Sequence, residues 1–251
     1  MSSVAHEEEA MVTLTGSGSD SEKTKLEARD GYWENDRQRQ LIGGIGLVLP
    51  AILIVMAVMR DGVERWRGLD SISAYYYSGA VSAFVGMLVS LAVFLFGYQG
   101  YKGKEYHKAD RAASCIAAAA ALGVALFPTA APEGVAALSW WSRVTGTLHY
   151  GFAVVLFLMF AVFSLWLFRL SPSPDKARRN SVYLICGLVI LANMIWAGIA
   201  GLRGTPIFWP ESFALIAFAV SWLVKGHAFK RIAGAARSLG DLFPRKGSAH
   251  A

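Results

Sequence analysis

The stretch Leu69–Tyr101, LDSISAYYYSGAVSAFVGMLVSLAVFLFGYQGY, decides the fold class. It opens with a cluster of hydroxyl and aromatic side chains. It then continues from Ser78 to Gly97 without a charged residue, for the roughly 20 residues that a helix needs to cross a bilayer. The stretch therefore predicts a membrane-spanning helix with a polar cluster at one mouth.

Small residues recur at every fourth position of this predicted helix, at Ser78, Ser82, Gly86 and Ser90. With about 3.6 residues per turn they share one face, and small residues let helices approach closely in lipid. We expect this face to pack against another helix. The larger side chains are expected largely on other faces, toward lipid; they are Phe84, Leu88, Leu91 and Leu95.

The composition of the whole chain supports a membrane protein. Of 251 residues, 55% are hydrophobic and only 17% are charged, against about a quarter in soluble domains. The net charge of +6 is spread among the loops, so no nucleic-acid partner is expected and membrane lipids are the expected surroundings.

Six apolar runs predict an all-α bundle of six transmembrane helices over residues 41–225. We expect a disordered cytoplasmic tail over 1–40 and a basic cytoplasmic tail over 226–251. Pro50 should kink the first helix, and the alanine-rich third helix should be surrounded by other helices. The runs are 41–59, 78–97, 110–128, 144–168, 181–202 and 207–224.

The distribution of basic residues predicts the orientation. Of the 24 Lys and Arg residues, 19 fall in the two tails and in the second and fourth loops, and 5 fall on the other side. The positive-inside rule then places both termini in the cytoplasm. The expected location is a bacterial cytoplasmic membrane.

Polar residues of unusual kind collect at the opposite, non-cytoplasmic ends of the predicted helices. If four of the helices adjoin, these side chains converge on one outward-facing pocket, and ionisable groups at membrane depth are functional candidates by default. The candidate ligand-binding residues are Asp70, Ser71, Ser73, Tyr75, Tyr76, Thr129, His149 and Glu211.

Each candidate also has a structural interpretation. Asp70 and Ser71 fit a helix N-cap, the tyrosines fit an aromatic belt, and Glu211 fits the positive end of a helix dipole. A lone buried histidine such as His149 is often a neutral core residue. At the cytoplasmic ends, capping, ion pairing and snorkelling suffice to explain a second set: Asp110, Asn180, Ser221 and Lys225.

The histidine positions exclude one class of enzyme. Only one of the five histidines, His149, lies within a predicted span, so a three-histidine zinc site of the ceramidase type cannot form in the membrane. No HExxH, GxSxG or P-loop motif occurs, and Cys115 and Cys186 have no metal or disulfide spacing. We expect no metal and no cofactor.

Three functions fit these observations. The first is binding, sensing or transport of a small solute or lipid headgroup in the outward pocket. The second is an intramembrane hydrolase or transferase that uses His149 with Glu211 or Asp70, and with Ser73 as a conceivable nucleophile. The third is a scaffold that binds partner helices, including a second copy of the chain.

Several motifs resemble uncharacterised bacterial six-span membrane proteins related to the DRAM-like and FGF-receptor-activating-protein-like group. The resemblance covers roughly residues 40–228 and implies a six-span fold and a membrane location. It implies no activity, because that group carries none to transfer. The motifs are IGLVLP, SISAYYYSGA leading into FVG, FLFGYQGY, ALFPT, the histidine of the fourth span and PESFALIAFAVSWLVKG.

Overall fold

The computed structural model describes residues 35–64, 69–100, 105–170 and 176–229, and this part of the chain is helical without a strand. Both expected tails lie largely outside these residues. The elements are a first helix Asn35–Asp61, the 3₁₀ helix η1 (Ser73–Tyr77), α3 (Val81–Gly97), α4 (His107–Leu126), α5 (Arg143–Val162), the π-helical turn η2 (Phe163–Leu167), α6 (Phe168–Leu170), α7 (Lys176–Leu202) and α8 (Phe208–Lys225).

All six predicted apolar runs are helical, and five of the helices are long and apolar enough to cross a membrane. One of these five is the continuous segment Arg143–Leu170, which joins α5, η2 and α6. The sixth, α3, has 17 residues, because the polar cluster before it forms the separate helix η1 instead of extending the span.

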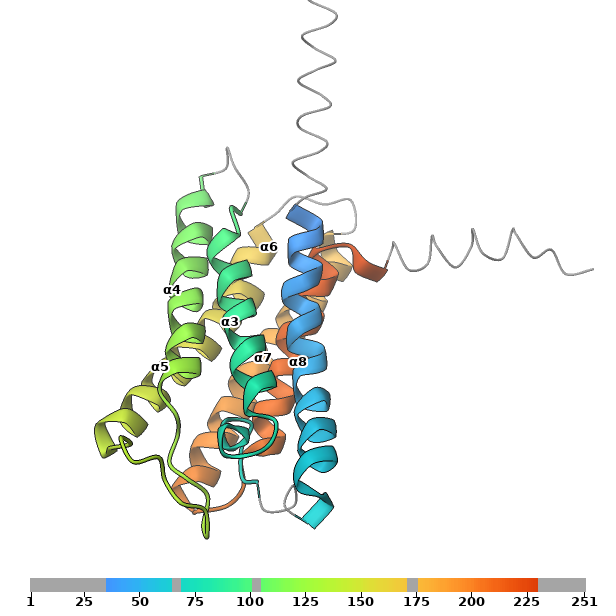
Figure 1. Cartoon of the computed structure of the whole chain (residues 1–251). Helices are drawn as coiled ribbons and strands as arrows, with labels where there is room; N and C mark the ends of the chain where they lie inside the picture. The colour runs from blue at the N-terminus through green and yellow to red at the C-terminus, as the bar shows by residue number, and fades with distance from the viewer. Residues whose placement is uncertain (1–34, 65–68, 101–104, 171–175, 230–251) are drawn as a thin grey trace, which may run out of the picture.

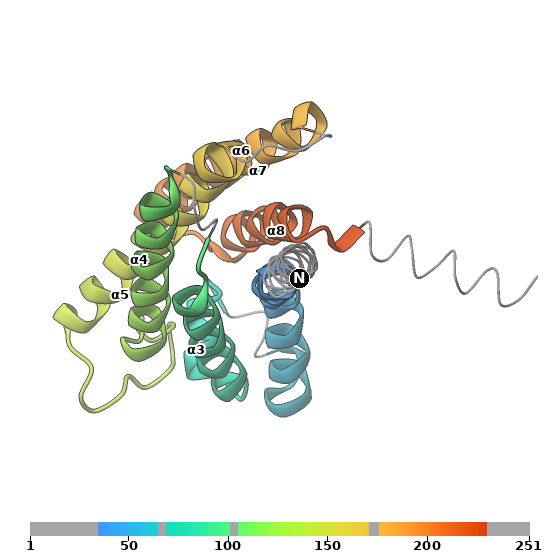
Figure 2. The same cartoon turned by 90° about the horizontal axis from the view of Figure 1, so that it is seen from above.

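The helices alternate in direction, so the first helix begins at the same end of the bundle where α8 ends (Figure 1). We refer to this as the upper end. Helix α8 packs between α7 and the first helix, and α4 packs between α3 and α5 (Figure 2). The prediction that the alanine-rich helix is surrounded by others is met on one side only: 56% of the apolar window of α4 is buried, against 39% for Arg143–Leu170, while Ile116, Leu122 and Leu126 on its other side are exposed.

The first helix begins at Asn35, so residues 35–40 belong to the bundle rather than to a disordered tail. It contains Pro50 and changes direction along its length (Figure 2), as expected where a proline removes a backbone hydrogen bond. Its contact with α8 is close: a Cβ added at Gly43 would lie 2.9 Å from the carbonyl oxygen of Ala219.

The prediction for the faces of α3 is wrong. Phe84, Leu88, Leu91 and Leu95 are buried, whereas Ser82, Gly86 and Ser90 are exposed. No atom would contact a Cβ at Gly86, and the Ser90 hydroxyl donates to the Gly86 carbonyl of its own helix. Phe84, Leu88 and Leu91 point to the interior instead, where they line a cavity between several helices.

Candidate functional site

The segment around η1 closes the lower end of the bundle. Instead of lying at the surface, it places Ser73, Ala74 and Tyr75 in the interior. Ser71, just before η1, accepts a hydrogen bond from the Ala74 amide at 3.0 Å through its hydroxyl. These contacts turn a short polar sequence into a plug between the helix ends, which we call the η1 plug (residues 70–77).

The start of α8 is tied to this plug by backbone groups. The Asp70 carbonyl accepts hydrogen bonds from the amides of Ile207, at 2.7 Å, and Phe208, at 2.9 Å. These amides precede or begin α8, where backbone donors lack partners within the helix. Asp70 therefore acts through its carbonyl, while its side chain is exposed.

Glu211 makes the second contact between α8 and the plug. Its Oε2 accepts a hydrogen bond from the Ile72 amide at 2.6 Å. The carboxylate lies in the first turns of α8, where the helix dipole favours a negative charge. The interpretation that Glu211 stabilises the start of a helix is thus supported. Its second carboxylate oxygen is left for other partners.

His149 of α5 joins the plug from the opposite side. Its Nε2 lies 2.9 Å from the Ser73 hydroxyl oxygen and its Nδ1 lies 2.6 Å from the Phe127 carbonyl oxygen. A carbonyl only accepts, so Nδ1 carries the proton and Nε2 of the neutral ring accepts from Ser73. The side chain is buried, and the backbone carbonyl holds it in one orientation.

A third connection runs from the plug to the α4–α5 loop. The Tyr77 hydroxyl donates to the Thr129 carbonyl at 2.8 Å, and the Thr129 hydroxyl donates to the Tyr150 hydroxyl at 3.3 Å.

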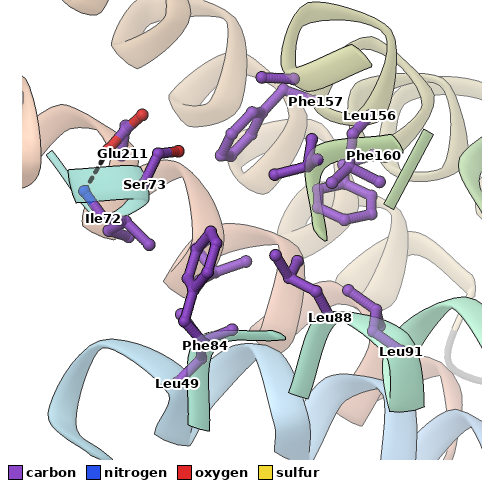
Figure 3. A pocket seen from close by; sticks show the side chains of 13 residues that line it. Leu49, Ile72, Ser73, Phe84, Leu88, Leu91, Leu156, Phe157, Phe160 and Glu211 are labelled. Carbon is purple, nitrogen blue, oxygen red and sulfur yellow. Dashed lines mark hydrogen bonds between the residues drawn. The ribbon is translucent and has the colours of Figure 1, made fainter. Parts of the chain in front are cut away.

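A small cavity of about 40 Å³ lies directly above the plug, at the centre of the bundle (Figure 3). Its walls are apolar except at the plug end, where Ser73 and Glu211 face it. The other lining residues are Leu49, Ile72, Phe84, Leu88, Leu91, Val124, Ala153, Leu156, Phe157, Phe160 and Leu215.

A larger pocket of about 460 Å³ lies between α5, α7 and α8. Glu211, Ala153 and Phe157 line both spaces, so the carboxylate stands at the boundary between the central cavity and this lateral pocket. The remaining lining residues are Tyr150, Val154, Asn193, Met194, Ala197, Gly198, Gly201, Leu202, Ile207, Pro210 and Ala214.

Ser73 lies in the plug, and Thr129, His149 and Glu211 contact it, but only Ser73 and Glu211 line a pocket, whereas Thr129 and His149 line neither of the two. Their role as ligand-binding residues stays a prediction. The other candidates lie elsewhere: the Asp70 side chain is outside both pocket linings, the Tyr75 ring packs on Phe208, and the Tyr76 ring packs on Phe84.

The lateral pocket itself is not evident from the sequence analysis. Tyr150 and the α7 wall were missed as pocket residues. A signal existed, because Met194, Ala197, Gly198 and Gly201 recur at the spacing of one helix face and are mostly small. Small residues on a face that no neighbouring helix fills leave a hollow.

The upper end of the bundle holds buried charged groups. Lys225 is only 1% exposed and donates to the Phe168 carbonyl at 2.9 Å, so the expectation that it snorkels to the surface is wrong. Asp36 pairs with Arg39 at 3.0 Å and with His227 at 2.9 Å. We call this the upper charged cluster; it consists of Asp36, Arg39, Tyr98, Asp110, Arg179, Lys225 and His227.

Within the part of the chain that the structure describes, no three His, Cys, Asp or Glu side chains gather closely enough to hold a metal ion. A comparison with protein families matches residues 51–226 to the family of unknown function DUF7103. No curated protein and no solved structure matches the chain.

Proposed function

Since the chain belongs to the DUF7103 family of unknown function, its role must be argued from its own geometry, and we propose that it is an integral membrane protein that binds a ligand at Glu211. The ligand is a small solute or a lipid headgroup. It occupies the pocket at the lower end of α5, α7 and α8, and the protein senses or transports it.

The position of Glu211 carries this proposal. A carboxylate among apolar helices costs free energy, by about 2.5–3.5 kcal/mol at the membrane centre and less toward the ends. One hydrogen bond from the Ile72 amide offsets only part of that cost, and the same side chain lines a pocket large enough for a small molecule. Because Glu211 also holds the Ile72 amide, a ligand that binds Glu211 is coupled to the position of the η1 plug.

The proposal includes a membrane arrangement. The helices cross six times, with both termini cytoplasmic and the η1 plug at the outer face of a bacterial cytoplasmic membrane. The sign of the loop charges and the alternating helix directions support this arrangement. The motifs of the sequence also support a relationship to the DRAM-like and FGF-receptor-activating-protein-like group.

Native mass spectrometry of the detergent-purified full chain tests the binding proposal. We expect a co-purifying ligand that Glu211→Gln loses. The glutamine oxygen still accepts from the Ile72 amide, so this variant removes the charge and keeps the tie to the plug. A bound species of unchanged occupancy in Glu211→Gln would contradict a role for the carboxylate in binding.

A second candidate, a hydrolase, is favoured by one contact. The Ser73 hydroxyl donates to a histidine nitrogen whose tautomer is set by a carbonyl, which is the arrangement of an activated nucleophile. The surroundings weigh against it. The amides of Ile72, Ala74 and Tyr75 are engaged by Glu211, Ser71 and Ile72, so they are not free to stabilise an oxyanion.

A further inference from the structure

The lateral pocket opens through the side of the bundle. Three of its lining residues are strongly exposed: Tyr150 is 52%, Val154 is 51% and Leu202 is 91% exposed. All three belong to helices that are apolar and long enough to span a membrane. In a bilayer, the mouth of this pocket therefore faces lipid, and a ligand enters sideways from the hydrocarbon.

The polar side chains of the pocket are Glu211, Asn193 and Tyr150, and the carboxylate of Glu211 is the one that only accepts hydrogen bonds. The Asn193 amide nitrogen donates to the Val189 carbonyl, which leaves its carbonyl oxygen and its second amide hydrogen for a ligand. The Tyr150 hydroxyl accepts from Thr129 and keeps its own proton. No Lys or Arg is among the described residues that line the pocket, so an anionic head group would meet Glu211 without a compensating charge.

Glu211 and Asn193 lie at opposite ends of the pocket along the helix axis, with an apolar wall between them. Glu211 lies at the lower end, where α7 ends at Leu202, and Asn193 lies about 14 Å farther along α7 at a rise of about 1.5 Å per residue. Between them the wall is formed by Ala197, Gly198 and Gly201. This shape fits an extended chain with a polar head.

We propose that the lateral pocket binds a single-chain amphiphile whose head group donates hydrogen bonds and carries no negative charge. A long-chain amine is the simplest member of this class. The inference rests on the proposed function, because it names the ligand class of the same site. It narrows that function in two ways: the ligand arrives from the bilayer, and its head is not a phosphate or carboxylate.

Titration of the purified full chain with three probes, followed by native mass spectrometry, tests this. Dodecylamine carries the expected head and chain, dodecanoic acid carries the chain with an anionic head, and ethanolamine carries the head alone. We expect one dodecylamine to bind per chain. Its affinity should fall on the order of tenfold in Glu211→Gln, since a charge-assisted hydrogen bond is lost.

Matched glycine variants test the location of the chain. Gly198 and Gly201 of α7 line the pocket, and a Cβ added at either would meet no atom within 4 Å, so Gly198→Leu and Gly201→Leu place added side-chain volume at the pocket wall. Gly151 of α5 is also free of contacts but lies outside the pocket lining, so Gly151→Leu is the control. We expect dodecylamine binding to be lost in the first two variants and unchanged in the third.

The outcomes separate this inference from the proposed function. Equal binding of dodecanoic acid would overturn the choice of head group, and equal binding of ethanolamine would overturn entry from the bilayer. A co-purifying ligand that requires Glu211, together with no dodecylamine binding, would overturn the amphiphile and leave the proposed function standing. If no ligand co-purifies and no probe binds, both proposals fail.

Discussion

Among single side chains, Ser73 and His149 make the contact that best separates a binding protein from an enzyme. We expect a fluorophosphonate probe to leave Ser73 unmodified in the purified protein. Ser73 is buried, and the amides of Ile72, Ala74 and Tyr75 beside it already donate to other groups, so these three cannot stabilise the charge of an attacked phosphoryl group.

Tryptic mass spectrometry of the probe-treated protein measures this directly. Labelling of Ser73 that disappears in His149→Ala would contradict the expectation and favour the hydrolase. Labelling that persists in that variant would show a reactive hydroxyl without histidine assistance, which is also contrary to a closed plug.

The meeting of Ser73, His149 and Glu211 could be predicted because their helix ends alternate along the chain. Antiparallel helices bring such ends to the same side of the bundle, where polar side chains form hydrogen bonds with one another. The partners that hold them could not be predicted. The Ile72 amide and the Phe127 carbonyl are backbone groups, and nothing in a sequence marks which backbone group a side chain will meet.

In the upper charged cluster, two basic side chains are buried although their positions in the sequence indicate exposure. Arg39 and Lys225 flank apolar runs, where long basic side chains usually reach toward the surface. Both are buried instead, because Asp36 pairs with Arg39 and the Phe168 carbonyl at the end of the π-helical turn accepts from Lys225. The irregular turn in the segment Arg143–Leu170 supplies that acceptor, and its position has no recognisable sequence signal.

For whole elements, the apolar runs located the six long helices, but they did not indicate the short helix η1 or the packing face of α3. An apolar helix has large residues on one side and small residues on another, and either side can face a neighbour. Which side packs depends on the size of the space between the helix and its neighbours. Phe84 and Leu88 line the central cavity between several helices, whereas Gly43 lies where two helices touch.

The contact between the first helix and α8 yields a prediction from two adjacent glycines. Gly43→Ala places a Cβ 2.9 Å from the Ala219 carbonyl oxygen, a backbone atom that cannot turn aside. We expect a loss of about 1–3 kcal/mol in the free energy of unfolding, by overpacking. Gly44→Ala meets no atom within 4 Å and should gain up to about 1 kcal/mol in helix propensity.

Thermal unfolding of the two variants in the same detergent measures both effects, and each variant serves as the control of the other. If Gly43→Ala were as stable as Gly44→Ala, the close approach of the first helix to α8 would be wrong.

On the scale of the whole molecule, η1 explains how the short helix α3 fits into a bundle of longer helices. A helix of 17 residues is about 26 Å long at 1.5 Å per residue, which is less than the roughly 30 Å of a hydrocarbon core. In the proposed six-span arrangement, the η1 plug fills the missing depth at the lower end, and its backbone groups bond to Glu211, Ser71 and the start of α8. Polar backbone at membrane depth is tolerated when it is buried in protein in this way.

The proposed orientation makes opposite ends of the bundle accessible from opposite sides of the membrane. Glu133, in the lower α4–α5 loop, and Lys108, near the upper start of α4, are both exposed. With Cys115 and Cys186 replaced by alanine, a membrane-impermeant maleimide should label Glu133→Cys in intact cells. It should label Lys108→Cys only after the membrane is permeabilised, because the basic upper loops stay in the cytoplasm. The reverse pattern would invert the bundle and place the η1 plug and Glu211 on the cytoplasmic side, whereas labelling of both cysteines in intact cells would mean that the two ends are not separated by a membrane.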